Sequence, residues 1–286
     1  MKSVPEQPSR SGQAEQEIAW VRLPGNHTAW VQREWNDALK KAGLRTADDF
    51  FSAIGEPLSK PGLGKRYRAR LSIDGQQLYL KRYDGDTLTG LLTRWYEDGK
   101  RTTTAEREAN VATALMQQGI GACVPAAFGH SRNFGTTQKS FIVTAAAPGV
   151  SLETFVEKEK EISWNEKLKL ARAVAILARK FHENGWRHRD FYLCHIFICK
   201  TEEQIQLTLI DLARVFRPRW RKERWLIKDL AQLNYSTPQQ VFSRTTRLRF
   251  ALEYFRCKKL TDMQKTLLRK VLRKTESIYR HDRSRS

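Results

Sequence analysis

The chain of 286 residues is long enough for one large or two small packed units, and its 40% hydrophobic content supports a buried core. Its 51 Lys and Arg residues against 31 Asp and Glu leave a net charge of +20, which favours an anionic partner such as nucleic acid, a phosphorylated sugar or an acidic lipid surface. The sequence has no apolar run near the roughly 18 residues of a membrane span, no signal-peptide core and no CxxC or zinc-like spacing among its four cysteines, so we expect a cytoplasmic protein without a disulfide framework.

The first half of the chain carries the signals of a small sheet. Residues 1–17 are polar and rich in Pro, Ser, Gln and Gly, so we expect a disordered leader, followed by a short helix over residues 28–44 that ends at Gly43. Residues 66–73 alternate between polar and apolar side chains, which is the period-two pattern of a half-buried strand. Asp74-Gly75 then predicts a type I′ turn, and a second strand should return over residues 76–83.

A helix and a further strand complete this half. Thr103 and Glu106 form a predicted capping box, which starts a helix that should end at Gly119. Residues 140–145 are apolar and predict a strand. Sheet-forming segments therefore dominate the chain up to Ala147.

The second half is rich in helix signals. Ser163 and Glu166 predict a second capping box, and a long amphipathic helix should run from there to Gly185. Two short strands are expected at residues 197–199 and 207–211, and the chain after them reads as helices.

These elements predict an α+β fold of two lobes with a cleft between them. After the leader, an N-terminal extension and a small antiparallel-sheet lobe should occupy residues 18–147, and a larger helical lobe should occupy residues 148–286. Ligand sites commonly form where two such units meet, so we expect the functional site in this cleft.

The most informative segment is His188-Arg189-Asp190, which follows the long helix and precedes a short apolar run. It resembles the catalytic loop of protein kinases, in which the Asp accepts the proton of an attacking hydroxyl. Asp190 is therefore the candidate base, with Arg189 as structural support and His188 as a packing residue. Protein kinases place an Asn five residues after this Asp to hold a second magnesium ion, and His195 stands there. Because Mg²⁺ prefers oxygen ligands, a structural or phosphate-contacting role for His195 is favoured over direct ligation.

A nucleotide-binding half of the site can be assembled from the first lobe. Gly62 and Gly64 precede the hairpin and would let backbone N–H groups approach phosphate oxygens, although an ordinary turn explains two glycines equally well. Lys81 lies in the returning strand, where it could reach the α- and β-phosphates as the kinase strand lysine does; the alternative is a surface lysine. Glu108 faces the packed side of the next helix, where an unpaired carboxylate is costly, so it is the expected partner of Lys81, with Glu106 as the competitor.

Asp211 is the candidate metal ligand. It ends the second of the two short strands, and a carboxylate in that position suits a Mg²⁺ ion that bridges the β- and γ-phosphates. A single Asp at a strand end is ordinarily a turn former. The order of Lys81, Glu108, Asp190 and Asp211 along the chain is what favours phosphotransfer over coincidence.

The chain resembles the lipopolysaccharide core kinase family of the WaaP (RfaP) type, which phosphorylates heptose I of the inner core and folds like a protein kinase. The resemblance covers about residues 47–240 and is most specific at the catalytic loop, including the His in place of Asn. It rests on the segments Tyr79-Leu80-Lys81, Arg107-Glu108, Leu115 to Gly119-Ile120, His188 to Phe197, Ile210 to Arg214, Arg219-Trp220-Arg221 and Lys228-Asp229-Leu230.

The resemblance implies a requirement for ATP and Mg²⁺, with Lys81, Glu108, Asp190 and Asp211 as the nucleotide-binding and catalytic residues. It also implies that the substrate is the anionic inner core of lipopolysaccharide. The choice of sugar rests on this family analogy alone.

Positive charge gathers in two segments behind the catalytic loop. The segment nearer the C-terminus, residues 267–274, alternates apolar and basic residues and could lie on an anionic bilayer. The protein would then be peripheral on the cytoplasmic face of the inner membrane. The same segment could instead pack on its own lobe. The first segment could hold carboxylates and phosphates of the glycolipid, or could be a solvated helix face. It contains Arg214, Arg217, Arg219, Arg221, Lys222, Arg224 and Lys228, interleaved with Trp220 and Trp225.

Three alternatives stay open. A related kinase could act on another sugar acid or on protein hydroxyls. A non-catalytic kinase relic is disfavoured because Asp190 and Asp211 are both present. A basic nucleic-acid-binding protein would explain the charge, but no helix-turn-helix, zinc-finger or RNP signature accompanies it, so nucleic acid is the disfavoured partner.

Overall fold

The computed structural model describes residues 19–58, 66–86, 102–131, 138–158, 162–201 and 204–284. The leader expected over residues 1–17 and the two glycines Gly62 and Gly64 lie outside these ranges. Within them, no helix combines the length and the apolar character that crossing a membrane requires.

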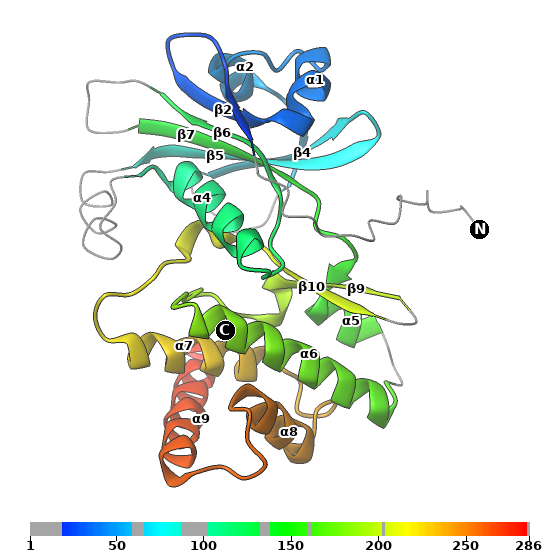
Figure 1. Ribbon diagram of the computed structural model, residues 1–286, viewed down its shortest axis with the longest axis vertical. Coiled ribbons are helices and arrows are strands. Elements are labelled where there is room, and N and C mark those ends of the chain that lie inside the picture. The colour runs from blue at the N-terminus through cyan, green and yellow to red at the C-terminus, as the bar shows by residue number, and fades with distance from the viewer. Residues whose placement is uncertain are drawn as a thin grey trace.

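The N-terminal lobe is built on a seven-stranded sheet (Figure 1). Its strands follow the order β1-β2-β6-β7-β5-β4-β3, and each is antiparallel to its neighbours. The strands are β1 Trp20–Arg22, β2 Thr28–Gln32, β3 Glu56–Pro57, β4 Arg66–Ile73, β5 Gln76–Asp86, β6 Pro125–His130 and β7 Gln138–Ala145.

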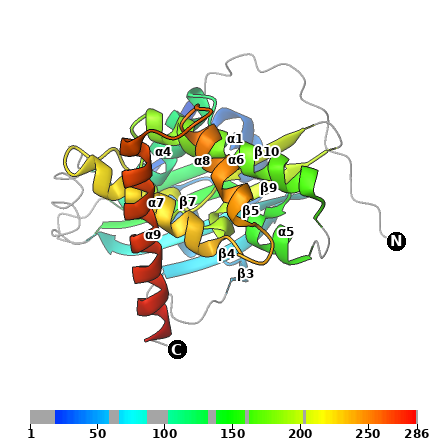
Figure 2. The ribbon, with the colours of Figure 1, turned by 90° about the horizontal axis from the view of Figure 1, so that it is seen from below.

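The C-terminal lobe is mostly helical and contains a small sheet of order β10-β9-β8. Together with the sheet of the first lobe it confirms the predicted α+β fold class. The strands are β8 Val150–Ser151, β9 Ile196–Lys200 and β10 Ile205–Leu209. The helices among the described residues are α1 Arg33–Lys41, α2 Ala47–Ser52, α4 Thr104–Gln117, α5 Leu152–Lys158, α6 Trp164–Glu183, α7 Lys222–Ser236, α8 Arg244–Tyr254 and α9 Asp262–Arg283, with the 3-10 turns η1 Leu193–His195 and η2 Leu212–Arg214. Helix α8 packs on α6 and α9 packs on α7 (Figure 2).

The hairpin predicted around Asp74-Gly75 is confirmed. Both residues have positive φ, 47° and 73°, as a type I′ turn requires. The turn sets the register in which Arg68 of β4 lies opposite Lys81 of β5, and β7 on the other side of β5 places Ile142 opposite the same lysine. The backbone of Lys81 is therefore held between two neighbouring strands.

The helix expected within residues 28–44 is wrong in its first part. Thr28–Gln32 form β2, and α1 begins only at Arg33. Ala29 and Val31 are buried, and β2 pairs with β1 on one side and with β6 on the other. These strand partners, of which β6 is distant in sequence, decide the conformation over the local helix signal.

Helices cover both faces of the large sheet (Figure 1). On the face of α1 and α2, Phe50 stacks on Phe141 with 4.6 Å between the ring centroids. On the opposite face, Ala105 and Ala109 of α4 pack in one cluster with Ile142. Because neighbouring strand residues point to opposite faces, Phe141 and Ile142 belong to different cores. The sheet thereby fixes the position of α4 relative to Lys81.

Caps define the helices next to the site. The capping box of Ser163 and Glu166 at the start of α6 is confirmed. At the start of α4, Thr103 Oγ1 accepts the Glu106 N–H, which is half of the expected capping box. Gly185, with φ 84°, follows the end of α6 and turns the chain toward the catalytic loop.

Candidate active site

Lys81 and Glu108 form the ion pair that the sequence predicts. Lys81 Nζ lies 2.7 Å from Glu108 Oε1, and the Glu108 side chain is fully buried. The hydroxyl of Tyr83, two residues beyond Lys81 on the same face of β5, donates to Glu108 Oε2 at 2.7 Å. The competing Glu106 lies in the first turn of α4, where its backbone N–H donates to the capping Thr103 Oγ1.

Lys81 also reaches Asp211, which joins the two lobes. Lys81 Nζ lies 3.3 Å from Asp211 Oδ1. Burial alone would lower the pKa of Lys81, but the carboxylates of Glu108 and Asp211 outweigh it and hold that pKa well above its usual value. Burial raises the pKa of Asp211, but the positive charge of Lys81, followed by His195, holds it well below the ordinary range. Both groups are therefore charged at neutral pH.

Asp211 does not end a strand as expected. Strand β10 ends at Leu209, and Asp211 adopts a left-handed backbone with φ 55° before the turn η2 begins. The backbone N–H of Ile210 donates to the carbonyl of His195 at 3.0 Å, which ties the Asp211 segment to the catalytic loop. The left-handed turn lets the carboxylate face Lys81 while the chain continues toward α4.

The catalytic loop is held from below by a buried carboxylate on α7. The backbone N–H groups of His188 and Arg189 donate to Asp229 at 2.7 and 2.9 Å, and Asp229 is fully buried. Phe191, also fully buried, stacks on Phe181 of α6. The loop is thereby fixed on both sides of Asp190, whose side chain remains partly exposed.

The other two residues of the predicted catalytic triplet, His188 and Arg189, are held by packing around the loop. His188 is fully buried, and its Nε2 donates to the carbonyl of Ile210 at 3.2 Å. Burial, reinforced by His195, lowers the pKa of His188 to about 4, so this ring is neutral. Arg189 has φ 72° and lies over the rings of Trp225 and Phe216, at 5.0 and 5.5 Å from their centroids. Both positions are those of supporting residues.

His195 connects the two aspartates. Its Nδ1 lies 2.8 Å from the carbonyl oxygen of Asp190, and because a carbonyl can only accept, Nδ1 carries a proton. Its Nε2 lies 3.9 Å from Asp211 Oδ2. His195 Nε2 and the Asp211 carboxylate thus face each other across a gap in which a bound cation could take both as ligands.

The carboxylate of Asp190 has a partner that the sequence does not single out as a site residue. Arg214 Nη1 lies 2.9 Å from Asp190 Oδ1 and 2.8 Å from Oδ2. Arg214 appears in the sequence as the last residue of the Ile210 to Arg214 string and as one of many cations in a basic segment, with no role assigned to it. Asp229 likewise stands out only as part of the Lys-Asp-Leu string, and Tyr83 only by its shared strand face with Lys81.

The structure thus brings Lys81, Glu108, Asp211, His195 and Asp190 into one connected cluster. Across the described ranges, no group of three or more His, Cys, Asp or Glu side chains is arranged to hold a metal ion by itself. A cation here would need ligands from a bound nucleotide as well, which is how proteins commonly hold Mg²⁺.

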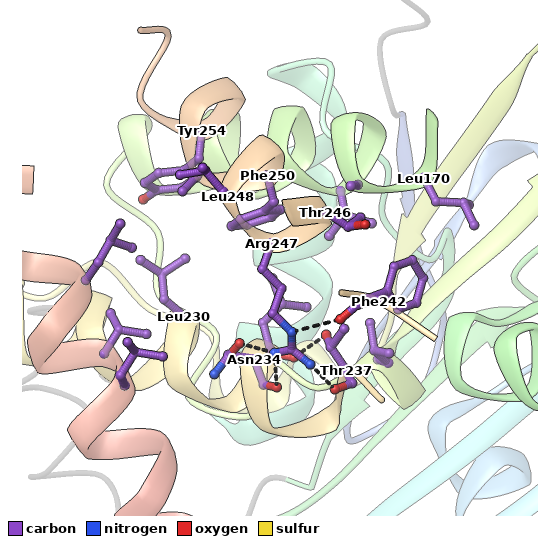
Figure 3. A pocket seen from close by; sticks show the side chains of 18 of the residues that line it. Leu170, Leu230, Asn234, Thr237, Phe242, Thr246, Arg247, Leu248, Phe250 and Tyr254 are labelled. Atoms are coloured by element: carbon purple, nitrogen blue, oxygen red, sulfur yellow. Dashed lines mark hydrogen bonds between the residues drawn. The ribbon is translucent and has the colours of Figure 1, made fainter. Parts of the chain in front are cut away.

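A separate apolar cavity of about 250 Å³ lies among helices α5 to α9 of the C-terminal lobe. Figure 3 shows Arg247 at its polar end, donating to the backbone carbonyls of Asn234, Thr237 and Phe242. Leu248 and Leu272 line the cavity and are also exposed to solvent, so the cavity opens on the surface near them. It shares no residue with the cluster around Lys81.

Known proteins resemble this chain over most of its length. The family model of the lipopolysaccharide kinase (Kdo/WaaP) family matches residues 61–254. The lipopolysaccharide core heptose(I) kinase WaaP of Pseudomonas aeruginosa is 31% identical over 240 residues, which are 76% of this chain and 87% of the relative. The enzyme of the same description from Escherichia coli K12 is 27% identical over 225 residues, which are 76% of this chain and 85% of the relative.

A solved structure of WaaP in complex with acyl carrier protein has the same fold. It superposes with a TM-score of 0.64 at 27% sequence identity, over 81% of this chain and 92% of that chain. The two-lobed, protein-kinase-like fold expected from the sequence is thereby confirmed.

Proposed function

Because the chain belongs to the lipopolysaccharide kinase (Kdo/WaaP) family, we propose that it transfers the γ-phosphoryl group of ATP to a hydroxyl of an inner-core heptose of lipopolysaccharide. The observation that carries the proposal is the contact of Lys81 with both Glu108 and Asp211, at 2.7 and 3.3 Å. This ion-pair bridge is the arrangement that a protein-kinase-like site needs before ATP can bind productively.

The residues of the cluster divide the work of phosphoryl transfer. Lys81, oriented by Glu108, binds the α- and β-phosphates. Asp190 orients the acceptor hydroxyl and takes its proton while the new oxygen–phosphorus bond forms and the bond between the γ-phosphorus and the bridging oxygen breaks, so that the electron pair leaves with ADP. Catalysis of this kind depends on alignment and on charge neutralisation.

Mg²⁺ fits the donors that face one another across the site. Asp211 would supply a carboxylate oxygen and His195 either its Nε2 lone pair or a contact through water, with nucleotide phosphates completing the shell. When bound, the ion would neutralise the charge that develops between the β- and γ-phosphates. The support is the 3.9 Å approach of His195 Nε2 to Asp211 Oδ2.

The decisive experiment compares lipopolysaccharide cores from cells with and without this protein by mass spectrometry. We expect one phosphate to be missing from the heptose region when the protein is absent. Transfer from radiolabelled ATP to core glycolipid, delipidated core sugars and a generic protein then separates heptose kinase activity from a kinase acting on another sugar acid or on protein hydroxyls. Labelling of the protein alone would reject the sugar as substrate.

We propose further that the protein works as a peripheral protein at the cytoplasmic face of the inner membrane, where a lipid-anchored acceptor and ATP meet. Helix α9 packs on α7 and its Val271 is buried. Arg269, Arg273 and Arg280 are exposed and project from the side of α9 opposite Val271. Such a face would bind anionic lipid electrostatically, so sedimentation with anionic but not zwitterionic vesicles, lost at high salt, is the expected result.

An acyl carrier protein is a proposed partner, because a solved WaaP structure contains one. An acyl carrier protein presents an acyl chain, and the cavity among α5 to α9 is apolar, about 250 Å³ in volume and open near Leu248 and Leu272. Ala251→Phe would fill the cavity from α8 and should weaken binding of acylated but not of unacylated carrier protein in calorimetry. Equal binding of the two forms by the unaltered protein would reject the cavity as the acyl site.

A further inference from the structure

Transfer of a phosphoryl group places growing negative charge on oxygens that a cation near the acceptor must balance. In this protein Lys81 pairs with Glu108 and Asp211 and is assigned to the α- and β-phosphates rather than to the acceptor. The loop between Asp190 and His195, Phe191-Tyr192-Leu193-Cys194, contains no Lys or Arg. The cation on the acceptor side must therefore come from another part of the chain.

Arg214 occupies that position. Its Nη1 contacts both carboxylate oxygens of Asp190, at 2.9 and 2.8 Å, and its side chain is 48% exposed. The guanidinium thus lies against the carboxylate that must receive the acceptor hydroxyl, with its remaining N–H groups available for further partners.

The backbone below Arg214 is fixed, so that only the side chain needs to move. Arg214 ends η2, whose other residues Leu212 and Ala213 are buried. The next carbonyl, that of Val215, accepts from Arg107 Nε of α4 at 3.1 Å. The same short turn therefore carries Asp211 at its start and Arg214 at its end, and α4 sets the position of both.

Lys228 of α7 supplies a second cation in the same region. Burial, followed by the charge of Arg214, lowers the pKa of Lys228, while Asp190 acts in the opposite direction. Lys228 Nζ lies 5.8 Å from the centroid of the Trp225 ring. If Arg214 turned away from Asp190, Lys228 would remain nearby to balance the carboxylate.

We propose that Arg214 is a catalytic residue that contacts the transferred phosphoryl group, an inference that rests on the proposed kinase function. Its two contacts with Asp190 hold the Arg214 side chain beside that carboxylate. When ATP and acceptor are bound, the acceptor hydroxyl takes an Asp190 oxygen and Arg214 donates N–H groups to the γ-phosphoryl oxygens. The hydroxyl proton passes to Asp190, the oxygen–phosphorus bond forms and ADP leaves with the electron pair of the broken bond.

The test compares three variants, Arg214→Gln, Arg214→Lys and Arg214→Ala, with the unaltered protein. Loss of one such donor typically lowers kcat by on the order of 10²–10³-fold, and we expect that loss in Arg214→Gln, with KM for ATP changed by no more than about threefold because Lys81 makes the ground-state phosphate contacts. Arg214→Lys should retain part of the rate. A guanidinium salt in solution should partly restore kcat to Arg214→Ala, which a merely structural role would not allow.

A transition-state analogue supplies a readout that needs no acceptor. ADP with aluminium fluoride and Mg²⁺ mimics the transition state of phosphoryl transfer. We expect Arg214→Gln to weaken the binding of this complex strongly and to leave the binding of ADP alone unchanged. Arg256→Gln, which removes an exposed arginine 3.8 Å from Glu183, is the matched control and should leave all these values unchanged.

Four outcomes overturn the inference. Arg214→Gln with kcat within about threefold of the unaltered protein would show that the phosphoryl group does not need this cation. A loss confined to KM for the glycolipid would make Arg214 a substrate anchor. A loss explained by a lower melting temperature, without guanidinium rescue, would make it structural. If the unaltered protein phosphorylates no core sugar, the proposed function itself is rejected, and the role of Arg214 with it.

Discussion

Tyr83 Oη donates a hydrogen bond to Glu108 Oε2 at 2.7 Å, on the carboxylate oxygen that Lys81 does not use. Burial, followed by the neighbouring charge of Glu108, raises the pKa of Tyr83 well above its usual value, so the phenol stays protonated and can only donate to this carboxylate. Both oxygens of a fully buried side chain are thereby paired. Tyr83 orients Glu108, and Glu108 orients Lys81.

Tyr83→Phe should therefore weaken nucleotide binding without touching the nucleotide. The change leaves Glu108 Oε2 without its donor, and an unpaired buried acceptor costs about 1–3 kcal/mol of stability. We expect a higher KM for ATP and a lower melting temperature. Tyr279→Phe, which removes a 3.2 Å hydrogen bond to the Tyr235 carbonyl on α7, is the control. It should lower stability alone, and an unchanged KM in Tyr83→Phe would contradict the positioning role.

Asp229→Asn should weaken the hydrogen bonds that hold the catalytic loop on α7. Each of the two hydrogen bonds that Asp229 accepts, from His188 and Arg189, is worth about 1.5–3 kcal/mol because the acceptor is charged. An amide can accept only on its oxygen, so one backbone N–H loses its partner. Denaturant unfolding should show a clear loss of stability, and kcat should fall more than ATP affinity. The control Asp262→Asn, on the exposed first turn of α9, should change neither the stability nor kcat.

Asp190→Ala should nearly abolish turnover while leaving ATP affinity close to normal. Asp190 contacts Arg214 and not Lys81, so its loss removes the group that receives the hydroxyl proton but not the phosphate contacts. Single-turnover transfer and calorimetric ATP binding measured side by side check this. Phosphate transfer at an undiminished rate would remove Asp190 from the mechanism.

Asp211→Asn should uncouple nucleotide binding from magnesium. In the unaltered protein we expect MgATP at a hundredfold its dissociation constant to raise the free energy of unfolding by about 2.7 kcal/mol. The amide lacks the charge that attracts Mg²⁺, so the part of this stabilisation that EDTA removes from the unaltered protein should be absent from the variant. A magnesium dependence that survives in Asp211→Asn would exclude Asp211 as a ligand.

Acidification should destabilise the protein through His188. Burial, followed by His195, lowers the pKa of His188 from 6.5 to about 4, so between these values the unfolded chain binds a proton that the folded protein does not. Stability should therefore fall as pH drops through this window, by on the order of 3 kcal/mol from this group at 1.36 kcal/mol per unit, and be unaffected above it. His182, whose pKa burial also lowers, acts in the same direction.

The variant His188→Phe isolates this contribution. It keeps the ring beside Phe181 and Phe191 but has no group to protonate, so its stability should vary less between pH 6.5 and 4. His281→Phe, at an exposed position of α9, is the control and should follow the unaltered protein. Parallel curves for all three proteins would contradict a neutral buried His188.

Local patterns in the sequence predict those parts of the fold that local interactions decide. The hairpin follows from alternation and from two residues that tolerate positive φ, and α6 follows from its capping box and apolar face. Strand β2 is not predicted because its partner β6 lies far along the chain. No pattern near residues 28–32 reports that neighbour.

The candidate site divides in the same way. Glu108 can be found because helical periodicity places a carboxylate on a packed face, and Asp190 because its neighbours form a recognisable string. Arg214 and Asp229 contact the catalytic loop from positions 24 and 40 or 41 residues downstream, as their hydrogen bonds show. Both stand in strings that carry the family resemblance, but only the folded chain shows that they contact the catalytic loop.

The segment between Asp211 and α7 is short and pinned at several points. Val215 accepts from Arg107, and Phe216 exchanges two backbone hydrogen bonds with Arg187, at 2.8 and 3.0 Å. Protein kinases are commonly switched by ordering a long loop in this region after phosphorylation. Residues 212–221 are too few and too tightly bonded to form such a loop. We therefore expect a constitutively active enzyme whose rate is set by the concentrations of its two substrates.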